Sequence, residues 1–347
     1  MEAFLKNEGS EAMLTTKRLW ITRDKVMRDR WINFLKVNDL QHDDQVDYTI
    51  GIFDKDELIG TASTYRNIIK LVAVCGDYQE QNLLTQLITE LSNYLWSNAY
   101  TKVFIYTKPE SVKYFCSLGF QTIAQTNSVA FMERGTPNFE QYANKLREVQ
   151  VDSQKAGAIV MNANPFTKGH LHLVKTALKQ CDHLYIFVLS DDTSMFSFED
   201  RFRLVKEGTA HLSNLTVVPS GEYQVSQATF PSYFLKEQAE EIVAKHQAEL
   251  DANLFKNRIA PILDIKIRFM GEEPQSKVTD IYNEAMQKVF GEEMELVIVP
   301  RLQSENEVIS ATQVRKAFEK GNFSLIERYT PSSTYQFLLE TYNKKKQ

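Results

Sequence analysis

The sequence has little cysteine and no long apolar run. Its three cysteines, Cys75, Cys116 and Cys181, are too few and too scattered for a disulfide framework or a zinc site. No uninterrupted apolar segment is long enough to cross a bilayer, and the first residues lack the apolar core of a signal peptide. We therefore expect a protein without membrane association, with the cytoplasm as the default location.

A strong excess of one charge is also lacking. The 347 residues include 40 Lys and Arg against 45 Asp and Glu, which gives a formal net charge of -5. This balance gives no argument for a nucleic-acid partner or an anionic membrane surface. The pattern G-x-x-x-x-G-K-S/T is absent too, so a P-loop nucleotide site is excluded. The length suits roughly two domains with sizeable cores.

The most informative stretch runs from Ala156 to Leu178. The apolar run 156–161 is followed by Asn162, Asn164 and Pro165, and then by Phe-Thr-Lys-Gly-His at the start of a helical pattern. This order predicts a buried strand that turns directly into a helix. In open α/β sheets such a turn lies at the carboxyl edge, where free backbone N–H groups and the helix dipole receive phosphate.

Two motifs stand near opposite ends of the part of the chain that begins at Ala156. Thr167 and His170 are three residues apart in the first helical turn, so their side chains are expected on the same side, and Gly169 leaves room for a ligand against the backbone. The second motif is Ile309-Ser-Ala-Thr-Gln-Val-Arg315. Together, and in this order, the two resemble the T/H-x-G-H and I-S-S-T-x-V-R pair of the nucleotidyltransferase superfamily. That resemblance implies a nucleotidyltransferase fold.

From Ala156 onward, strand and helix patterns alternate, which is typical of a parallel sheet. We expect strands at 156–161, 183–189, 215–219, 262–269 and 294–299, and helices near 169–180, 198–212, 232–250, 276–289 and after Ser310. Five right-handed crossovers would make one doubly wound, Rossmann-like α/β domain over residues 156–347. Residues 136–155 are predicted to be a linker that begins with an amphipathic helix.

Residues 1–135 follow a different pattern. We expect a hairpin of strands 48–53 and 57–64, a strand at 68–74, a helix at 81–98, a strand at 102–107, a short helix at 110–117 and one closing strand. The stretch Val112-Lys-Tyr-Phe-Cys-Ser-Leu-Gly-Phe120 resembles the end of GNAT acetyltransferase domains, which implies a GNAT-like α+β domain. GNAT enzymes hold the acetyl-CoA pyrophosphate on a glycine-containing loop, but the corresponding segment here, Gln79 to Leu84, has no glycine. This departure argues against an intact acetyltransferase. A module that keeps the fold to contact a CoA-like group loosely, or only to dock a protein, is expected at least as much as an acetyl-transfer site.

Three further stretches follow the expected strands and converge on the carboxyl edge of the sheet. They are 223–236, which includes Ser226, Thr229 and Tyr233; 268–274, which includes Gly271 and Glu272; and the stretch from Arg301 to Ser310. Their convergence predicts a lined pocket. Its substrate contacts are expected from the five named residues of the first two stretches.

The order of these segments along the whole chain resembles the citrate (pro-3S)-lyase ligase family. The resemblance implies a cytoplasmic, ATP-dependent enzyme that activates acetate as acetyl-AMP and releases diphosphate. The acetyl group would then pass to the thiol of the phosphoribosyl-dephospho-CoA group on the acyl carrier subunit of citrate lyase. The implied partners are citrate lyase and acetate, and Mg²⁺ would be carried on the ATP phosphates rather than held by a protein metal site.

That chemistry gives the residues roles. Thr167, His170, Ser310 and Arg315 are the expected catalytic set: the first two would bind the α- and β-phosphates, Ser310 and the helix it caps the leaving diphosphate, and Arg315 would add positive charge. The expected nucleotide-binding set is Asn162, Asn164, Pro165, Phe166, Lys168, Gly169, Arg301, Ile309, Ala311 and Thr312. The two asparagines are as well suited to fixing the turn through bonds to the backbone as to contacting the ligand. A lysine on a helix surface, such as Lys168, is more often simply solvated.

Other features carry less weight. His172, two residues from His170, is expected to face elsewhere, so a metal pair is improbable. Asp191 and Asp192 are better explained as an exposed acidic loop than as Mg²⁺ ligands. Two alternatives to the ligase remain: an adenylyltransferase for a phosphate-bearing acceptor, such as a pantetheine phosphate or a mononucleotide, and a nucleotide-binding adaptor.

Overall fold

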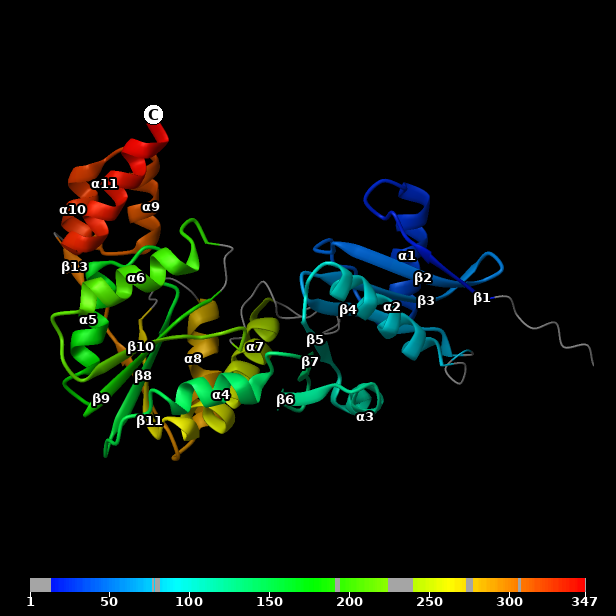
Figure 1. The fold of residues 1–347 in the computed structure, drawn as a ribbon, viewed down its shortest axis with the longest axis horizontal. Coiled ribbons are helices and arrows are strands. Elements are labelled where there is room, and N and C mark those ends of the chain that lie inside the picture. Colours follow the sequence, from blue (N-terminus) through cyan, green and yellow to red (C-terminus); the bar gives the residue numbers. More distant parts are fainter. Residues whose placement is uncertain are drawn as a thin grey trace, which may run out of the picture. The chain divides into compact units, whose positions relative to one another are not determined.

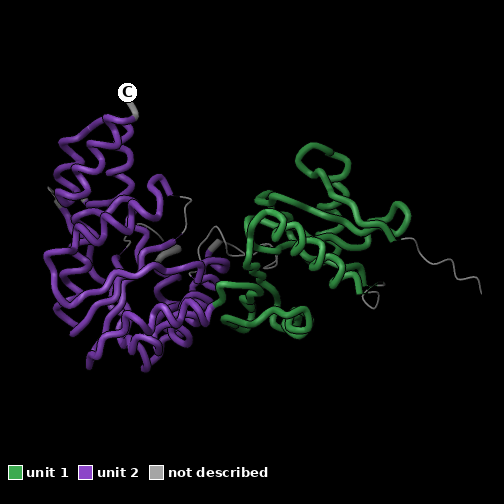
Figure 2. The backbone as a smooth tube through the Cα atoms, viewed as in Figure 1, with its two compact units in different colours: residues 1–138, 227–239 green, residues 139–226, 240–347 purple. Residues whose placement is uncertain are grey.

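The structure, a computed structural model, describes residues 14–76, 78, 82–190, 194–223, 240–272, 277–304 and 307–346. The chain forms two compact units, shown in different colours in Figure 2. The first comprises residues 1–138 and 227–239, and the second comprises residues 139–226 and 240–347. The functional limits 1–135, 136–155 and 156–347 stay a prediction.

The first unit is built on a mixed sheet in the order β1-β2-β3-β4-β5-β7-β6. Its strands are β1 (Leu14–Arg18), β2 (Tyr48–Asp54), β3 (Glu57–Tyr65), β4 (Ile68–Val74), β5 (Lys102–Thr107), β6 (Gln121–Gln125) and β7 (Ala130–Gly135). Its helices are α1 (Lys25–Val37), α2 (Leu83–Ser97), the short η2 (Pro109–Ser111) and α3 (Val112–Ser117). The β2–β3 hairpin, β4, α2, β5 and α3 confirm the expected elements. Two strands, β6 and β7, close the unit where the sequence predicted one.

Helix α2 supplies much of the core of this unit. Its Leu83, Leu87, Ile88, Leu91 and Leu95 are all at most 1% exposed and pack against the sheet. These positions recur every three or four residues, so one apolar stripe faces the strands. The apolar pattern in the sequence therefore placed the helix correctly, although the helix begins two residues later than expected.

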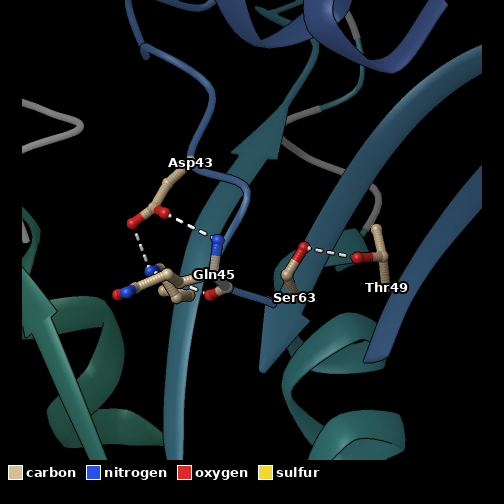
Figure 3. A network of polar contacts seen from close by, with 5 residues as sticks. Asp43, Gln45, Thr49 and Ser63 are labelled. Atoms are coloured by element: carbon tan, nitrogen blue, oxygen red, sulfur yellow. Dashed lines mark hydrogen bonds and ion pairs between the residues drawn. The ribbon is translucent and has the colours of Figure 1, made fainter. Parts of the chain in front are cut away.

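Polar contacts link the segment before β2 to the strands beside it (Figure 3). Asp43 accepts from the backbone N–H of Gln45 (2.8 Å) and from the ammonium of Lys70, whose Nζ also donates to the Gln45 carbonyl (3.2 Å). Thr49 and Ser63 share a hydroxyl hydrogen bond of 2.9 Å across β2 and β3. Lys70 is 6% exposed, so the paired carboxylate compensates a buried charge.

The second unit is a five-stranded parallel sheet in the order β10-β9-β8-β11-β12. The elements up to the fourth strand are α4 (Phe139–Arg147), β8 (Ala156–Met161), α5 (Lys168–Ala177), β9 (His183–Val188), α6 (Phe198–Thr209), β10 (Leu215–Pro219), α7 (Glu240–Leu254), η4 (Phe255–Ile259), η5 (Ala260–Ile262) and β11 (Ile265–Gly271). The rest are α8 (Lys277–Phe290), β12 (Glu295–Val299), β13 (Gln303–Ser304), β14 (Glu307–Val308), α9 (Ala311–Glu319), α10 (Phe323–Tyr329) and α11 (Ser332–Lys346). The doubly wound parallel sheet is confirmed.

Two details differ from expectation. Five strands in one parallel sheet are joined by four connections, not five. The fourth strand begins at Ile265 rather than 262, because Ala260–Ile262 form the short helix η5 and Asp264 has a positive φ of 51°. A positive φ is outside the β region, so the extended backbone begins only after Asp264.

Helices cover both faces of this sheet (Figure 1). Residues of α5 and α6 pack with Ile159, Ile186 and Phe269 in one apolar core. On the opposite face, Phe187 of β9 meets Phe255 of η4 in an edge-to-face contact with ring centroids 5.9 Å apart. The linker helix α4 belongs to this unit too, since the Tyr142 hydroxyl donates to the Pro219 carbonyl (3.1 Å).

Gly208 of α6 is required by the packing of Phe166. A Cβ built on Gly208 would lie 2.6 Å from two ring carbons of Phe166, which is fully buried. Replacing a glycine in a helix with alanine usually stabilises by about 0.5–1 kcal/mol, but overpacking a core costs about 1–3 kcal/mol. The steric cost is the larger contribution, so the substitution of Gly208 by alanine is expected to lower the stability of the fold.

We expect Gly208→Ala to lower the midpoint of urea unfolding of the second unit. All three tryptophans, Trp20, Trp31 and Trp96, lie in the first unit, so their fluorescence reports that unit and serves as an internal control. Far-UV circular dichroism should show the earlier transition while the fluorescence transition stays in place. Gly271→Ala is the matched variant, because its added Cβ meets nothing within 4 Å. A Gly208→Ala protein as stable as the parent would contradict this packing.

Candidate active site

The order of the parallel strands places a cavity at one edge of the sheet. The chain runs outward from β8 through β9 to β10 and then returns to β11 on the other side of β8. Loops leaving neighbouring strands in opposite directions open a crevice at their carboxyl ends, where ligands of this fold class bind. A cavity of about 820 Å³ lies there. It is lined by the ends of β8, β11 and β12, the start of α5, and the segment from Val308 into α9.

The start of α5 is fixed by a reciprocal pair of hydrogen bonds between Thr167 and His170. The backbone N–H of His170 donates to Thr167 Oγ1 (3.3 Å), and the backbone N–H of Thr167 donates to His170 Nδ1 (3.0 Å). This is a capping box in which histidine takes the usual place of glutamate. Because an amide N–H can only donate, Nδ1 must be the unprotonated ring nitrogen. The neutral His170 therefore carries its proton on Nε2.

His170 is held in its neutral form. It lines the cavity and its ring stacks on buried Phe166, with centroids 5.7 Å apart and planes at 15°. Burial, and to a smaller extent the nearby positive charge of Arg301, lower the pKa of His170 to about 4. At neutral pH the side chain is thus a fixed N–H donor without a formal charge.

A second helix begins at the same cavity. Ser310 is the N-cap of α9, and its hydroxyl accepts from the backbone N–H of Gln313 (3.2 Å). Ser310 and the two residues that follow it, Ala311 and Thr312, all line the cavity. The positive ends of two helix dipoles, α5 and α9, therefore meet at one site, which suits a polyanion such as a triphosphate.

Gly169 allows these two segments to approach each other. A Cβ on Gly169 would lie 3.2 Å from the Ile309 carbonyl and 3.4 Å from Thr167 Oγ1. The structure shows that Gly169 makes room for the chain before α9, while the predicted room for a ligand against its backbone stays a prediction. Both Gly169 and Ile309 line the cavity.

Several residues of the predicted nucleotide set fix the turn after β8. The carbonyl of Asn164 accepts from Arg315 Nη1 (2.6 Å), and its side-chain Oδ1 accepts from the Phe196 N–H (3.3 Å). Pro165 and Phe166 are buried. Arg315 also donates to Thr312 Oγ1 (3.0 Å), so it links the start of α9 to the turn. Their contacts with nucleotide stay a prediction.

Lys168 is directed to another helix. Its Nζ donates to the carbonyls of Glu327 (3.1 Å) and Arg328 (2.9 Å) at the end of α10. An ammonium at a helix C-terminus satisfies carbonyls that lack partners within the helix and complements the dipole. This arrangement gives Lys168 a role in joining α5 to the C-terminal helices.

Arg201 organises the other side of the turn, and the sequence analysis missed it. Its side chain is fully buried in α6 and donates to the carbonyls of Asn162 (2.9 Å), Leu189 (2.7 Å) and Phe196 (3.1 Å). It also donates to Asn162 Oδ1 (2.7 Å). The available signal was an arginine at a core-facing position of an amphipathic helix, between Phe198 and Leu204.

Other predicted residues have mixed outcomes. Arg301 and Gly271 line the cavity, and Arg301 Nε donates to the Glu272 carbonyl (2.5 Å). His172 also lines the cavity, so the expectation that it faces elsewhere is wrong: of α5, the cavity borders Gly169, His170, His172 and Leu173. Ser226, Thr229, Tyr233, Asp191 and Asp192 lie outside the described residues.

Comparison with known proteins decides the family. Over 313 residues the chain is 36% identical to the citrate (pro-3S)-lyase ligase of Haemophilus influenzae. This alignment covers 88% of this chain and 93% of that protein. The corresponding ligase of Klebsiella pneumoniae is 34% identical over 333 residues, or 94% of this chain and 97% of its own length. Residues 156–338 match the family described as the citrate lyase ligase C-terminal domain. The chain belongs to the citrate lyase ligase family.

Membership of the citrate lyase ligase family, an enzyme family, confirms the resemblance inferred from the motifs. Residues 21–133 match the GNAT acetyltransferase domain family, which confirms the GNAT-like first domain. A shorter similarity, 39% identity over 70 residues, links the chain to phosphopantetheine adenylyltransferase of Streptococcus gordonii, covering 20% of this chain and 43% of that protein. None of the helices among the described residues has the length and apolar character needed to span a membrane.

The lowered pKa of His170 predicts how stability depends on pH. An unfolded histidine has a pKa near 6.5, about 2.5 units above the folded value of about 4. As the pH falls below about 6.5, the unfolded chain binds this proton first, so His170 contributes a loss of stability that grows until about pH 4. Above pH 7 it contributes no pH dependence.

Histidine ring ¹⁵N NMR should show His170 as the Nε2–H tautomer at pH 7, with a titration midpoint far below 6.5. In urea unfolding, His170→Gln should reduce the acid sensitivity between pH 6.5 and 4. A His170 signal that titrates near pH 6.5, or one with its proton on Nδ1, would contradict the capping geometry.

Proposed function

We propose that this protein is an ATP-dependent ligase that activates acetate as acetyl-AMP and then acetylates citrate lyase. The acceptor is the thiol of the phosphoribosyl-dephospho-CoA group on the acyl carrier subunit, and AMP and diphosphate are released. The observation that carries the proposal is the convergence of two capped helix N-termini and the His170 donor on one cavity. Similarity to ligases of this name over about nine-tenths of the chain supports the same reaction.

The donors at the cavity suit the triphosphate of ATP. His170 Nε2–H would bind the α- and β-phosphates, and Thr167, whose hydroxyl lies 3.0 Å from His170 Nδ1, would hold the ring in place. Ser310 with the first N–H groups of α9 would hold the departing diphosphate. Arg301 adds a permanent positive charge to the lining. Arg315 would act mainly by holding the turn after β8, through its bond to the Asn164 carbonyl.

The first step needs placement and charge stabilisation more than proton transfer. A carboxylate oxygen of acetate attacks the α-phosphorus in line with the bond to diphosphate, and that bond breaks with its electron pair leaving on diphosphate. As charge builds on the leaving group, the fixed His170 N–H donor binds it more strongly than the ground state. A charged imidazolium is unnecessary, because the helix ends and Arg301 supply the positive field.

A magnesium ion would travel with the nucleotide. Among the described residues, no cluster of three His, Cys, Asp or Glu side chains is placed to hold a metal ion. Mg²⁺ usually keeps several waters and binds substrate phosphates, so the donor set of this site suits an ion carried by ATP. When bound, it would neutralise phosphate charge.

The GNAT-like unit would serve the second step. The segment from Gln79 to Leu84 lacks the glycines that let a backbone approach a pyrophosphate, so acetyl-CoA is not the expected acetyl donor. We propose that the unit receives the carrier subunit or its CoA-like group. Acetyl transfer to the thiol would then follow adenylate formation in the second unit.

The test of the first step is isotope exchange. Acetate and Mg·ATP should support the exchange of labelled pyrophosphate into ATP without citrate lyase. His170→Ala should reduce this exchange about 10²–10³-fold, the usual effect of removing one preorganised donor to a developing charge. His211→Ala, at an exposed site of the same unit, should leave it unchanged.

Two outcomes would contradict the proposal. Exchange that survives His170→Ala would remove His170 from the reaction. Exchange or AMP transfer that appears only when a pantetheine phosphate or a mononucleotide replaces acetate would favour the adenylyltransferase alternative.

A further inference from the structure

One buried arginine of the cavity lining has no role in the proposed phosphate site. Arg268 stands on β11, one strand from the centre of the sheet, and is 4% exposed. The sequence analysis had placed it at the start of a loop, but the strand continues to Gly271. Within the part of the chain that the structure describes, Arg268 Nε and Nη1 are buried and have no hydrogen-bond partner. Arg268 nonetheless lines the cavity.

Its surroundings compensate the charge only in part. Nη2 lies 3.7 Å from Asp251 Oδ2, beyond hydrogen-bond distance, and that oxygen accepts from the Tyr282 hydroxyl (3.1 Å). Phe255 lies against the guanidinium, with its ring centroid 4.2 Å from Arg268 Cζ. Burying N–H donors of a cation without acceptors is costly, so such a group calls for a ligand or a structural reason.

The neighbouring lining is apolar. Strand register pairs Arg268 with Ala158, so Met270 and Val160, two residues further along each strand, lie on the same face of the sheet as Arg268. Both line the cavity, as does Val299 of β12. The helix N-termini and His170 line the same cavity from the loops beyond the strand ends. One cavity thus joins an anion-binding end to an apolar part that contains a guanidinium.

We propose that Arg268 binds the carboxylate of the acid substrate through its unpaired N–H groups, with the short alkyl group packed against Val160 and Met270. The inference rests on the proposed function, since it identifies the second substrate of the same site. The planar guanidinium fork matches a carboxylate. Its stacking on Phe255 fixes the plane of that fork.

Charge favours a carboxylate over a phosphate at this position. With Asp251 beside it, Arg268 is part of a pair whose net charge is near zero, so a phosphate dianion would meet the Asp251 carboxylate without an excess of positive charge. A monoanionic carboxylate needs only two parallel N–H donors from one edge of the guanidinium, and Nη2 with either Nε or Nη1 supplies them. The bound acid stays ionised, and each carboxylate oxygen keeps a lone pair that the guanidinium does not use, so one oxygen can form the bond to the α-phosphorus while Arg268 holds the group.

The experiment compares substrate dependence in pyrophosphate exchange. For Arg268→Gln we expect the KM for acetate to rise at least about 30-fold, because truncating one partner of a buried charge pair has effects of this order or larger. The KM for ATP should change far less. Lys266→Gln is the matched control: this lysine is on the same strand, but it is half exposed and paired with Asp264 (2.6 Å). Its KM values should match those of the parent.

A double variant separates substrate binding from a structural role. Arg268→Gln removes the charged partner of the buried Asp251 and can thereby destabilise the fold. The double variant Asp251→Asn, Arg268→Gln removes both charges together. The double variant should regain stability in thermal unfolding and keep the raised KM for acetate. If it regained the parent KM, or if ATP and acetate were affected equally, Arg268 would be a structural residue and the inference would be overturned.

Equilibrium binding distinguishes this inference from the proposed function. Acetate binding is measured by calorimetry on the full chain saturated with Mg²⁺ and α,β-methylene-ATP. Binding by the parent that is lost in Arg268→Gln supports the carboxylate site even if no exchange occurs, in which case the proposed function alone fails. Equal binding by parent and variant, or none by either, overturns the Arg268 assignment.

Discussion

The reciprocal hydrogen bonds between Thr167 and His170 are the constraint on which the site depends. They end the turn after β8, start α5 and fix which ring nitrogen of His170 faces the ligand. A histidine in this position has both its orientation and its tautomer set by the backbone. A glutamate there would make the same cap but would present a negative charge to the phosphates.

The surrounding residues hold this turn from several directions. Phe166 stacks beneath the imidazole and fits only because position 208 is glycine. Arg201 and Arg315 donate to backbone carbonyls on either side of the turn. Backbone carbonyls attract a guanidinium without neutralising it, so these arginines stiffen the loop and keep their positive charge near a site for anions. This explains how a chain with a net charge of -5 carries a locally positive site.

Two chemically different kinds of hydrogen-bond donor line different parts of the cavity. Helix N-termini, a neutral histidine and Arg301 offer N–H donors and positive charge of the kind that suits phosphates. On the opposite face of the sheet edge, a single guanidinium with apolar neighbours offers a fork suited to one carboxylate. In the proposed reaction one cavity would hold both substrates with their reacting atoms close together, which is the main requirement of an in-line displacement.

The sequence by itself determined the parallel α/β domain, the GNAT-like domain, and the start of α5 and α9. Each of these depends on local signals: the period of apolar residues, and a Thr or Ser before the first helical turn. Thr167, His170 and Ser310 could be found this way because the residues that cap the two helices also line the cavity. The family followed from motif order, which needs no coordinates.

Tertiary structure alone decided which side chains share the cavity. Lys168 and His170 are two residues apart in one helix, yet Lys168 contacts α10 while His170 lines the cavity, because the C-terminal helices pack beside the first of them. Arg201 and Arg268 looked like ordinary charged residues of a helix and a loop, and only packing between distant segments buried them. Such contacts depend on strand order and on helix placement across the sheet, so local sequence patterns carry no record of them.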